Sequence, residues 1–258
     1  MVCRDTVVLG AREALMIIVN ADDWGSSPIE TNAALACYRE ERITSVSAMV
    51  FMEDSVRASG LAKETGIDTG LHINLTQRFS GEAPLRSLAD CHERVASFLA
   101  AHKYAFLIYN PALRNQFRYV YQAQIEEFIR LYDRAPSHLD GHHHQHLCAN
   151  MLIDGVIPAG AKVRRNFHFW PGEKALASRT YRRLVDGCLA RRYKLTDFFF
   201  ALSQCLRGDR MARVAELART RTVEVMTHPA NPIERGYLMG DSYLSAIHGL
   251  ERGTYSKL

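Results

Sequence analysis

The sequence contains no long apolar run and no repetitive tract, and these absences exclude several classes of protein. No stretch of about 18 uninterrupted apolar residues occurs, which excludes a membrane-spanning helix. The apolar runs near the N-terminus are short and interrupted by charged residues, so we predict a soluble chain without a signal peptide. No internal repeat, low-complexity tract or Pro/Gly-rich linker divides the chain. We therefore predict one domain, 1–258, with an N-terminal extension at 1–14.

Paired cysteines are also absent. The six cysteines are scattered and form no CxxC pair, the spacing typical of zinc and redox sites. Scattered thiols of this kind are typical of a reduced protein, so we predict a cytoplasmic location. Net charge is modest at +4, yet residues 162–221 contain fifteen Lys and Arg against five Asp and Glu. These charges either solvate helix surfaces or attract an anionic substrate.

Apolar runs and amphipathic segments alternate along the chain. The apolar runs predict strands at 16–22, 43–51, 70–75, 137–140, 162–165, 195–202 and 222–227. The segments between them predict helices, including 28–41, 53–63, 86–102 and 115–132. Ser27 and Glu30 form a capping box at the first helix, with Pro28 at its first position. This alternation predicts an α/β fold with a parallel sheet, either a TIM-like barrel or a doubly wound sheet.

Acidic and histidine side chains follow four of the predicted strands. Asp22 and Asp23 end the first strand, His72 lies in 70–75, His142 follows 137–140, and His228 closes 222–227. The carboxyl ends of parallel strands meet at one edge of the sheet, where α/β proteins build their sites. Packing alone does not explain four such residues at that edge.

Each of these residues also has a structural interpretation. The Asp pair could be a turn or a helix cap, His72 a hydrogen-bonded core residue, and His228 a capped strand end. Adjacent carboxylates raise the pKa of one partner unless a cation stabilises both. A bound metal supplies that cation, with one Asp directed at the metal and the other at its water.

The segment from His138 to His146 contains five histidines in nine residues. His138 and Asp140 would share one face of a strand, and His142 and His146 one face of a helical turn. A metal-bound imidazole usually donates its other ring N–H to a carboxylate, a position that Asp140 suits. The segment predicts metal binding and leaves open which histidine is the ligand.

Five motifs together resemble the YdjC-like carbohydrate deacetylases, which include chitooligosaccharide deacetylases and members associated with hopanoid biosynthesis. The motifs are NADDWG, TSVSAMV, GLHINL, HLDGHHHQH and EVMTHP, and they span most of the chain. Two positions depart from the family pattern: Trp24 stands where Phe is usual, and Gly141 where Ser is common. The basic segment 162–221 matches no motif of the family.

The resemblance implies an irregular TIM-like (β/α) barrel, a single deacetylase domain that hydrolyses N-acetyl groups with one divalent metal ion. It implies Asp23, His72 and His142 as metal ligands, Asp22 as general base and His228 as general acid. Asp140, His138 and His146 would support the ligands by hydrogen bonds or supply an alternative ligand. The imidazole and carboxylate donors favour zinc or another transition metal, and magnesium stays open.

The substrate implied by the resemblance is an N-acetylated sugar. Trp24 beside the Asp pair is a candidate for stacking on a pyranose ring. Arg164 and Arg165, on a predicted strand, are candidate contacts to an anionic substrate. A homodimer is left open.

Two alternative functions remain. A metal-dependent phosphoesterase or sugar isomerase also uses Asp and His at strand ends, but usually with more carboxylate ligands. The basic segment could instead bind nucleic acid, although the chain has no zinc-finger spacing or RNA-recognition signature, so we predict no nucleic-acid partner.

Overall fold

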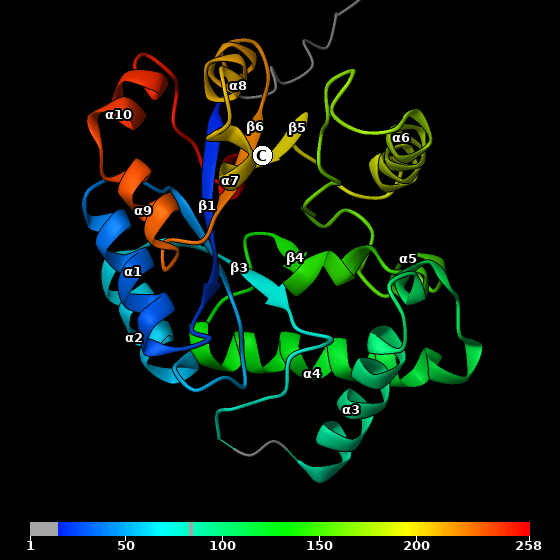
Figure 1. Ribbon diagram of the computed structural model, residues 1–258. Coiled ribbons are helices and arrows are strands. Elements are labelled where there is room, and N and C mark those ends of the chain that lie inside the picture. The colour runs from blue at the N-terminus through cyan, green and yellow to red at the C-terminus, as the bar shows by residue number, and fades with distance from the viewer. Residues whose placement is uncertain (1–14, 83–84) are drawn as a thin grey trace, which may run out of the picture.

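The described residues contain a parallel sheet of six strands in the order β4-β3-β2-β1-β6-β5, with helices around its outer face (Figure 1). This computed structural model describes residues 15–82 and 85–258, so the predicted N-terminal extension at 1–14 lies outside the described residues. The strands are β1 (Ile17–Trp24), β2 (Ser45–Ala48), β3 (Asp68–Ile73), β4 (Leu139–Gly141), β5 (Phe198–Ala201) and β6 (Val223–Thr227).

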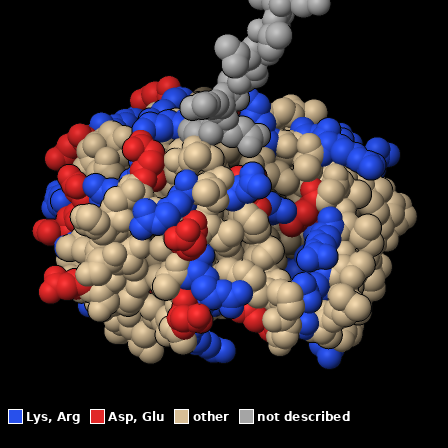
Figure 2. All heavy atoms as spheres, turned by 90° about the horizontal axis from the view of Figure 1, so that it is seen from above, with Lys and Arg blue, Asp and Glu red and all other residues tan. Residues whose placement is uncertain are grey.

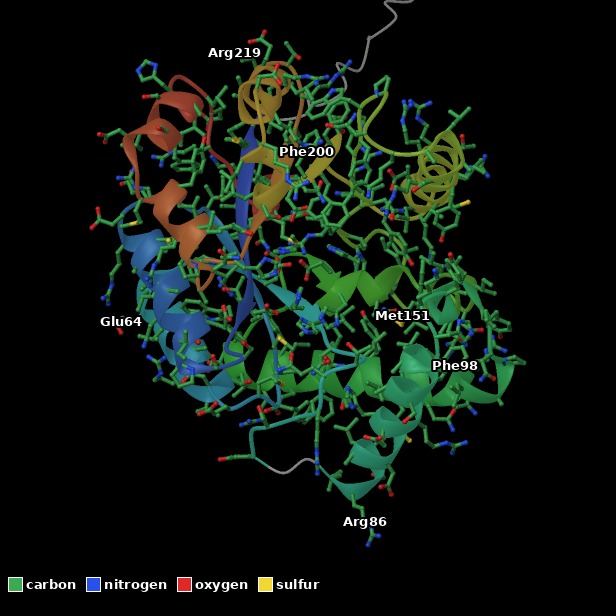
Figure 3. All side chains as sticks on the ribbon, in the orientation of Figure 1. Glu64, Arg86, Phe98, Met151, Phe200 and Arg219 are labelled. Carbon is green, nitrogen blue, oxygen red and sulfur yellow. The ribbon has the colours of Figure 1, made fainter. Side chains whose placement is uncertain are left out.

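Helices connect the strands and cover the outside of the sheet. They are α1 (Pro28–Arg39), α2 (Ser55–Thr65), α3 (Arg86–Ala100), α4 (Arg114–Tyr132), α5 (Ala149–Ile153), α6 (Leu176–Ala190), α7 (Leu202–Cys205), α8 (Arg210–Ala218), α9 (Pro232–Leu238) and α10 (Asp241–Ile247). Short 3₁₀ turns are η1 (Ala105–Leu107), η2 (Pro111–Leu113), η3 (His142–Leu147) and η4 (Tyr255–Lys257). The charged side chains of Glu64, Arg86 and Arg219 lie at the outer edge of this arrangement (Figure 3). In the part of the chain that the structure describes, no helix combines the length and apolarity needed to cross a membrane.

The two faces of the sheet have opposite character. Side chains alternate along each strand, so one set faces the helices and the other faces the inside of the curled sheet. In β1, Ile17, Val19 and Ala21 belong to the main hydrophobic core. The intervening Asn20 and Asp22 are buried as well, but among polar side chains. The inner face of the sheet therefore forms a second, polar interior.

Buried polar residues from other strands line the same inner face. They are Ser45, Ser47, His72, Asp140 and Glu224, each at most 2% exposed. Small apolar clusters bound this polar layer. One contains Met16, Ile18 and Tyr255, and another contains Phe199, Ala201 and Met226. Because buried polar groups must be hydrogen-bonded to be tolerated, this layer fixes its side chains in defined positions.

Most predicted elements are present, with corrections to three strands. Two strands are shorter than predicted: the one at 43–51 spans only Ser45–Ala48, and the one at 195–202 spans only Phe198–Ala201. The strand predicted at 162–165 is wrong, because this segment forms only isolated bridges, Leu139 with Val163 and Lys162 with Lys194. The α/β single domain is confirmed, and the six strands form a curled half-barrel, fewer than the eight of a TIM barrel.

The segment that follows α5 lies between the two edge strands. The Leu139 N–H donates to the Lys162 carbonyl at 2.9 Å, which joins the segment to β4. Further on, the His168 N–H donates to the Phe199 carbonyl at 2.9 Å, which joins it to β5. Irregular backbone thus connects the open edges of the sheet and carries Arg164 into the polar interior.

Substitution of Gly70 would test how tightly this interior is packed. A Cβ atom at Gly70 would lie 2.3 Å from the ring of buried His138. Gly70→Ala should therefore lower the free energy of unfolding by about 1–3 kcal/mol through overpacking. Gly60, inside α2, has no atom within 4 Å of such a Cβ, so Gly60→Ala should raise it by up to about 1 kcal/mol. Urea unfolding of both variants checks this, and equal effects would contradict the packing described.

Candidate metal centre

A backbone irregularity at the end of β1 brings two consecutive carboxylates to one side of the sheet. The register with β2 shifts between Ala21 and Trp24, and Asp23 adopts a left-handed conformation with φ of 65°. Strict alternation would direct Asp23 toward the helices, on the side of Ala21. The shift instead directs both Asp22 and Asp23 to the inner edge. Such conformations in non-glycine residues are uncommon and cluster at functional sites.

Asp23, His72 and His142 converge at this edge. The Asp23 Oδ1 atom lies 3.0 Å from His142 Nδ1 and 3.4 Å from His72 Nε2. One ligand atom from each residue lies within 4.8 Å of the other two, a separation that could hold a metal ion. Two imidazoles and a carboxylate leave further coordination positions open, as in catalytic metal sites.

His72 is oriented from behind by a second carboxylate. Its Nδ1 atom lies 2.8 Å from Asp140 Oδ1, and the two residues are paired in the register of β3 and β4. The carboxylate fixes the ring so that Nε2 points at Asp23. This carboxylate–histidine arrangement is typical of metal-ligating histidines.

Arg164 lies beneath the cluster and binds three carboxylates. Its guanidinium donates to both oxygens of Asp22 at 2.7 and 2.8 Å, to Asp140 Oδ2 at 2.6 Å and to Glu224 Oε1 at 2.8 Å. The other oxygen of Glu224 accepts the hydroxyl of Tyr255. Arg164 and Glu224 have no exposed surface. The guanidinium thereby holds the carboxylates of β1, β4 and β6 together.

A second cluster of metal-ligand type, Asp22, His72 and Asp140, is less suited to an ion. One nitrogen of Arg164, Nη1, lies 2.8 Å from Asp22 and 2.6 Å from Asp140. A metal between these carboxylates would have to displace a buried guanidinium. The group of Asp23, His72 and His142 contains no such cation.

Electrostatics shift the pKa values of the interior groups. Burial disfavours charged His72, but the carboxylates of Asp140 and Asp22 outweigh it and raise the pKa of His72 to about 9. Burial raises the pKa of Glu224 to about 7, against the opposing effect of Arg164. The three carboxylates exceed the charges of Arg164 and protonated His72 by one. A proton on Glu224 removes that excess.

Asp23 stays ionised at the mouth of the cluster. Burial alone would raise the pKa of its carboxyl, but the hydrogen bond with His142 and the charges of His72, His142 and His228 hold the pKa well below its ordinary value. His228 Nε2 lies 3.8 Å from Asp23 Oδ2, and its side chain is 38% exposed. His228 thus lies partly exposed to solvent beside the Asp23 carboxylate.

His138 and His146 lie outside both metal-capable groups. His138 Nε2 is 3.0 Å from the hydroxyl of Ser47, and its ring stacks on Tyr255 at 3.9 Å. His146 Nε2 is 3.0 Å from the carbonyl oxygen of Arg164. Burial lowers the pKa of each to about 4, so both imidazoles are neutral. Both rings are packed inside the polar interior, where His138 contacts Ser47 and His146 contacts the backbone of Arg164.

The predicted helical turn over the histidines is wrong in its geometry. His143 and His144 inside η3 have φ values of 53° and 57°, outside the helical range. The chain therefore reverses after His142, and His146 does not share a face with it. His142 is directed at Asp23, whereas His146 packs against the backbone of Arg164.

The structure also corrects the expected substrate contacts. Trp24 has no exposed surface and lies in the main core, so its ring cannot stack on a sugar. Arg164 is fully buried with its three carboxylates and has no surface to offer a ligand. Arg165 is paired with Asp186 at 2.9 Å and donates to the backbone carbonyls of Thr196 and Asp197.

The excess positive charge of residues 162–221 is partly buried or paired. Arg164 is fully buried with its carboxylates, and Arg165 is paired with Asp186. On the face seen in Figure 2, Lys and Arg side chains lie among Asp and Glu side chains on the left and predominate on the right.

Sequence patterns missed several members of the polar interior. Glu224 was available as a signal, because it is the one charged residue within the otherwise uncharged strand β6. Tyr255 lies far away in the C-terminal η4, and its contact with Glu224 depends on the tertiary fold. Asn20 donates to Asp22 at 3.0 Å and to Ser47 at 2.7 Å. Sequence patterns assigned Asn20 no role beyond its place in the NADDWG motif.

The fold and the cluster together define an α/β protein with a metal-capable Asp/His site at the carboxyl edge of its sheet. The family model described as YdjC-like protein matches residues 16–248. The chain belongs to this family.

Relatives in the family are named as deacetylases. The chain is 27% identical to the chitooligosaccharide deacetylase of Serratia marcescens over 83% of this chain and 81% of that protein. It is 28% identical to the chitooligosaccharide deacetylase of Proteus mirabilis, over 95% and 99% of the two chains. It is 27% identical to the carbohydrate deacetylase of Homo sapiens, over 86% and 77%.

A solved structure shares the fold. A protein of Enterococcus faecalis, described as a candidate cellobiose-phosphate cleavage protein, matches with a TM-score of 0.66. The match covers 93% of this chain and 97% of that chain at 17% identity. At this identity the likeness shows the fold alone.

Glu224 gives the site a testable pH dependence. Because its pKa is raised to about 7 in the folded protein, the folded state binds an extra proton between pH 4.5 and that value. The stabilisation is complete below about pH 4.5 and is lost as pH rises through about 7, by up to about 3 kcal/mol. Glu224→Gln is neutral throughout and lacks this component. Urea unfolding of both proteins from about pH 5 to about pH 8 should show wild type losing free energy of unfolding relative to Glu224→Gln as the pH rises. A difference between the two proteins that does not change with pH would contradict the raised pKa of Glu224.

Proposed function

We propose that this protein is a metal-dependent hydrolase that removes an N-acetyl group from an amino sugar or oligosaccharide. The observation that carries the proposal is the convergence of Asp23, His72 and His142 beside Asp22 and His228, at the carboxyl edge of the sheet. The names of the relatives support the carbohydrate substrate. We extend the proposal to one deacetylase domain over residues 1–258, with the segment between β4 and β5 completing an irregular barrel.

The donor set fits one divalent metal ion. Asp23 would supply an oxygen, and His72 and His142 a nitrogen each, while Asp140 holds the His72 ring in place. Nitrogen and oxygen donors together favour zinc, nickel, cobalt or manganese, with magnesium as an alternative. When bound, the ion would polarise the acetyl carbonyl and acidify a water molecule. His72, with a pKa of about 9, would release its proton as the ion binds.

Asp22 is the proposed general base. It lies next to the ligand Asp23, and one of its oxygens is 3.9 Å from the Nε2 atom of His72. Oδ1 of Asp22 accepts from both Arg164 and Asn20, whereas Oδ2 accepts from Arg164 and keeps a further lone pair that can accept a proton. The fixed position of this carboxylate aims it at the attacking water.

His228 is the proposed general acid. Its side chain is 38% exposed, against 2% for His72 and 13% for His142. A protonated imidazole there can donate to the nitrogen that leaves as the sugar amine. Its backbone N–H is fixed by the carboxylate of Glu234 at 2.8 Å, which anchors the end of β6.

The metal site is tested by metal content. His142→Ala should reduce the bound divalent metal from one ion per chain to a small fraction, because it removes a ligand and leaves the His72–Asp140 pair intact. His248 is exposed in the C-terminal region, and His248→Ala is the matched control that should keep the ion. Elemental analysis after dialysis measures both. Full metal content in a folded His142→Ala protein would exclude the proposed ligand set.

The base is tested by acetate release from N,N′-diacetylchitobiose. Asp22→Asn should retain the metal and lose about 10²–10⁴ in kcat, the usual contribution of a general base. Asp90 is exposed on α3, so Asp90→Asn should keep wild-type kcat. Near-normal turnover by a folded Asp22→Asn protein would show that Asp22 serves only the polar interior.

A further inference from the structure

A cavity of about 570 Å³ opens beside the proposed metal centre. This volume lies within the range of small-molecule sites in proteins, about 300–1,000 Å³. His143 lines the cavity, and its ring centroid is 4.0 Å from that of the proposed ligand His142. The cavity thus lies next to the edge of the sheet where the acetyl group would react.

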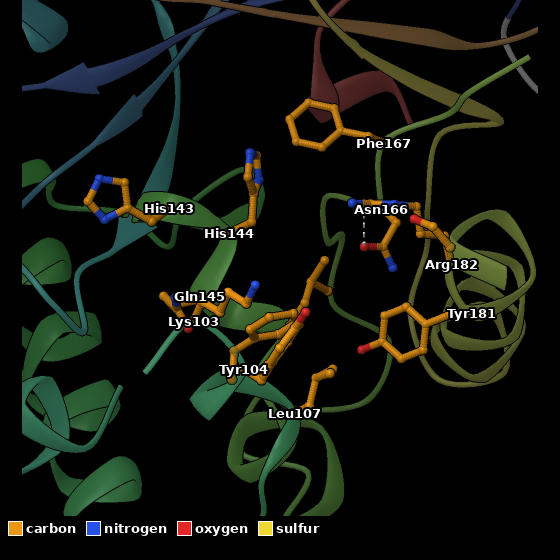
Figure 4. A pocket seen from close by; sticks show the side chains of 13 residues that line it. Lys103, Tyr104, Leu107, His143, His144, Gln145, Asn166, Phe167, Tyr181 and Arg182 are labelled. Carbon is orange, nitrogen blue, oxygen red and sulfur yellow. Dashed lines mark hydrogen bonds between the residues drawn. The ribbon is translucent and has the colours of Figure 1, made fainter. Parts of the chain in front are cut away.

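Three parts of the chain form the walls of this cavity (Figure 4). One is the stretch around η1, with Lys103 and Tyr104, and another is η3. The third is made by Asn166 together with Tyr181 and Arg182 of α6. Tyr104 and Tyr181 are 55% and 40% exposed, so their rings are accessible to a ligand. They offer the aromatic faces that the buried Trp24 cannot.

Several polar atoms in the wall have no partner. Asn166 is only 8% exposed, and its amide nitrogen makes no hydrogen bond. The same holds for His144 Nδ1, Gln145 Oε1 and Arg182 Nε. A buried polar group left unpaired costs about 1–3 kcal/mol, so such groups need an explanation. The residues that carry these atoms all line one cavity.

Arg182, like Lys103, is a cation of this wall that forms no ion pair among the described residues. Among the described residues, no carboxylate oxygen lies within 4.0 Å of its guanidinium, whereas neighbouring Arg165 is paired with Asp186. Its polar contact is Asn166 Oδ1 at 3.4 Å, and the rings of Phe167 and Phe169 lie 6.0 and 5.3 Å from its central carbon. Burial lowers the pKa of this guanidinium. A bound anion would supply the missing counter-charge.

We propose that this cavity binds the substrate beyond its acetamido group, and that Arg182 and Asn166 recognise an anionic oxygen group, a carboxylate or a phosphate, on the sugar. The inference rests on the proposed function, because that function places the acetamido group at Asp23 and His142. A guanidinium binds either anion through two parallel hydrogen bonds, and the Asn166 amide can add a third. The substrate class is then an anionic N-acetyl amino sugar.

The experiment compares three sugars that differ at one carbon. They are N-acetylglucosamine, its 6-phosphate and N-acetylglucosaminuronic acid, which carries the carboxylate. Their dissociation constants are measured by calorimetry on the metal-loaded Asp22→Asn protein, in which turnover is suppressed, and kcat/KM is measured on the active enzyme. At least one anionic sugar should bind about 10–100 times more tightly than the neutral one, the usual effect of a charge-assisted pair. The anionic sugar that binds more tightly identifies the recognised group as a phosphate or a carboxylate.

Two variants assign the effect to Arg182. Arg182→Gln should reduce the ratio of anionic to neutral kcat/KM by about 10–100-fold. Arg191, exposed at the end of the same helix, provides the control, since Arg191→Gln changes the net charge equally without touching the cavity. Equal effects of the two variants on this ratio, or no preference for either anion in wild type, would overturn the inference.

The two proposals can fail separately. Acetate released from all three sugars without anion preference would keep the deacetylase function and remove the anion subsite. Tighter binding of an anionic sugar without acetate release from any of them would keep the subsite and remove the deacetylase function.

Discussion

The ion network around Arg164 determines the arrangement of the whole interior. Its guanidinium lies in a fully buried position and binds carboxylates from β1, β4 and β6, strands that are not all neighbours in the sheet. An unpaired buried charge costs several kcal/mol, so neither the guanidinium nor the carboxylates are stable there without the others. The curvature that brings these strands around one guanidinium is therefore coupled to the charges themselves.

The same network orders the residues at the edge of the sheet. Arg164 fixes Asp140, Asp140 orients His72, and His72 presents its second nitrogen to Asp23. Through its bond to Asp22, Arg164 also fixes the proposed base next to the proposed metal ligands. Because these groups are buried and hydrogen-bonded to one another, they are held in defined positions. Support of this kind explains why a fold would maintain so many buried charges.

Sequence patterns predicted the positions of the six strands, several of the helices and the edge at which the candidate site lies, and they also predicted one strand, 162–165, that is absent. They succeeded because a buried parallel strand has a recognisable apolar run, and because Asp22, His72, His142 and His228 each follow or end one. They could not show that the register shifts at Asp23, since a left-handed aspartate leaves no periodic signal. That shift is what makes two adjacent aspartates available on one side.

The errors have a common physical origin. Arg164 was expected on a strand and facing a ligand, but it forms buried ion pairs with three carboxylates from distant parts of the sequence. Trp24 was expected near solvent, but the same register shift that exposes Asp23 buries the indole ring in the main core. Burial and partner choice depend on long-range contacts, which local patterns do not encode. The cavity beside α6 is missed for the same reason.

The claim that the site of Asp23, His72 and His142 supports hydrolysis is tested most directly by metal titration. Protein stripped with a chelator is titrated with zinc, and in parallel with nickel, cobalt, manganese and magnesium, while acetate release from an N-acetylated chitooligosaccharide is followed. The account predicts no release from the stripped protein, and activity that rises with added metal and saturates at one ion per chain. Release that survives chelation, or one bound ion per chain with no acetate produced from any N-acetylated sugar, would contradict it.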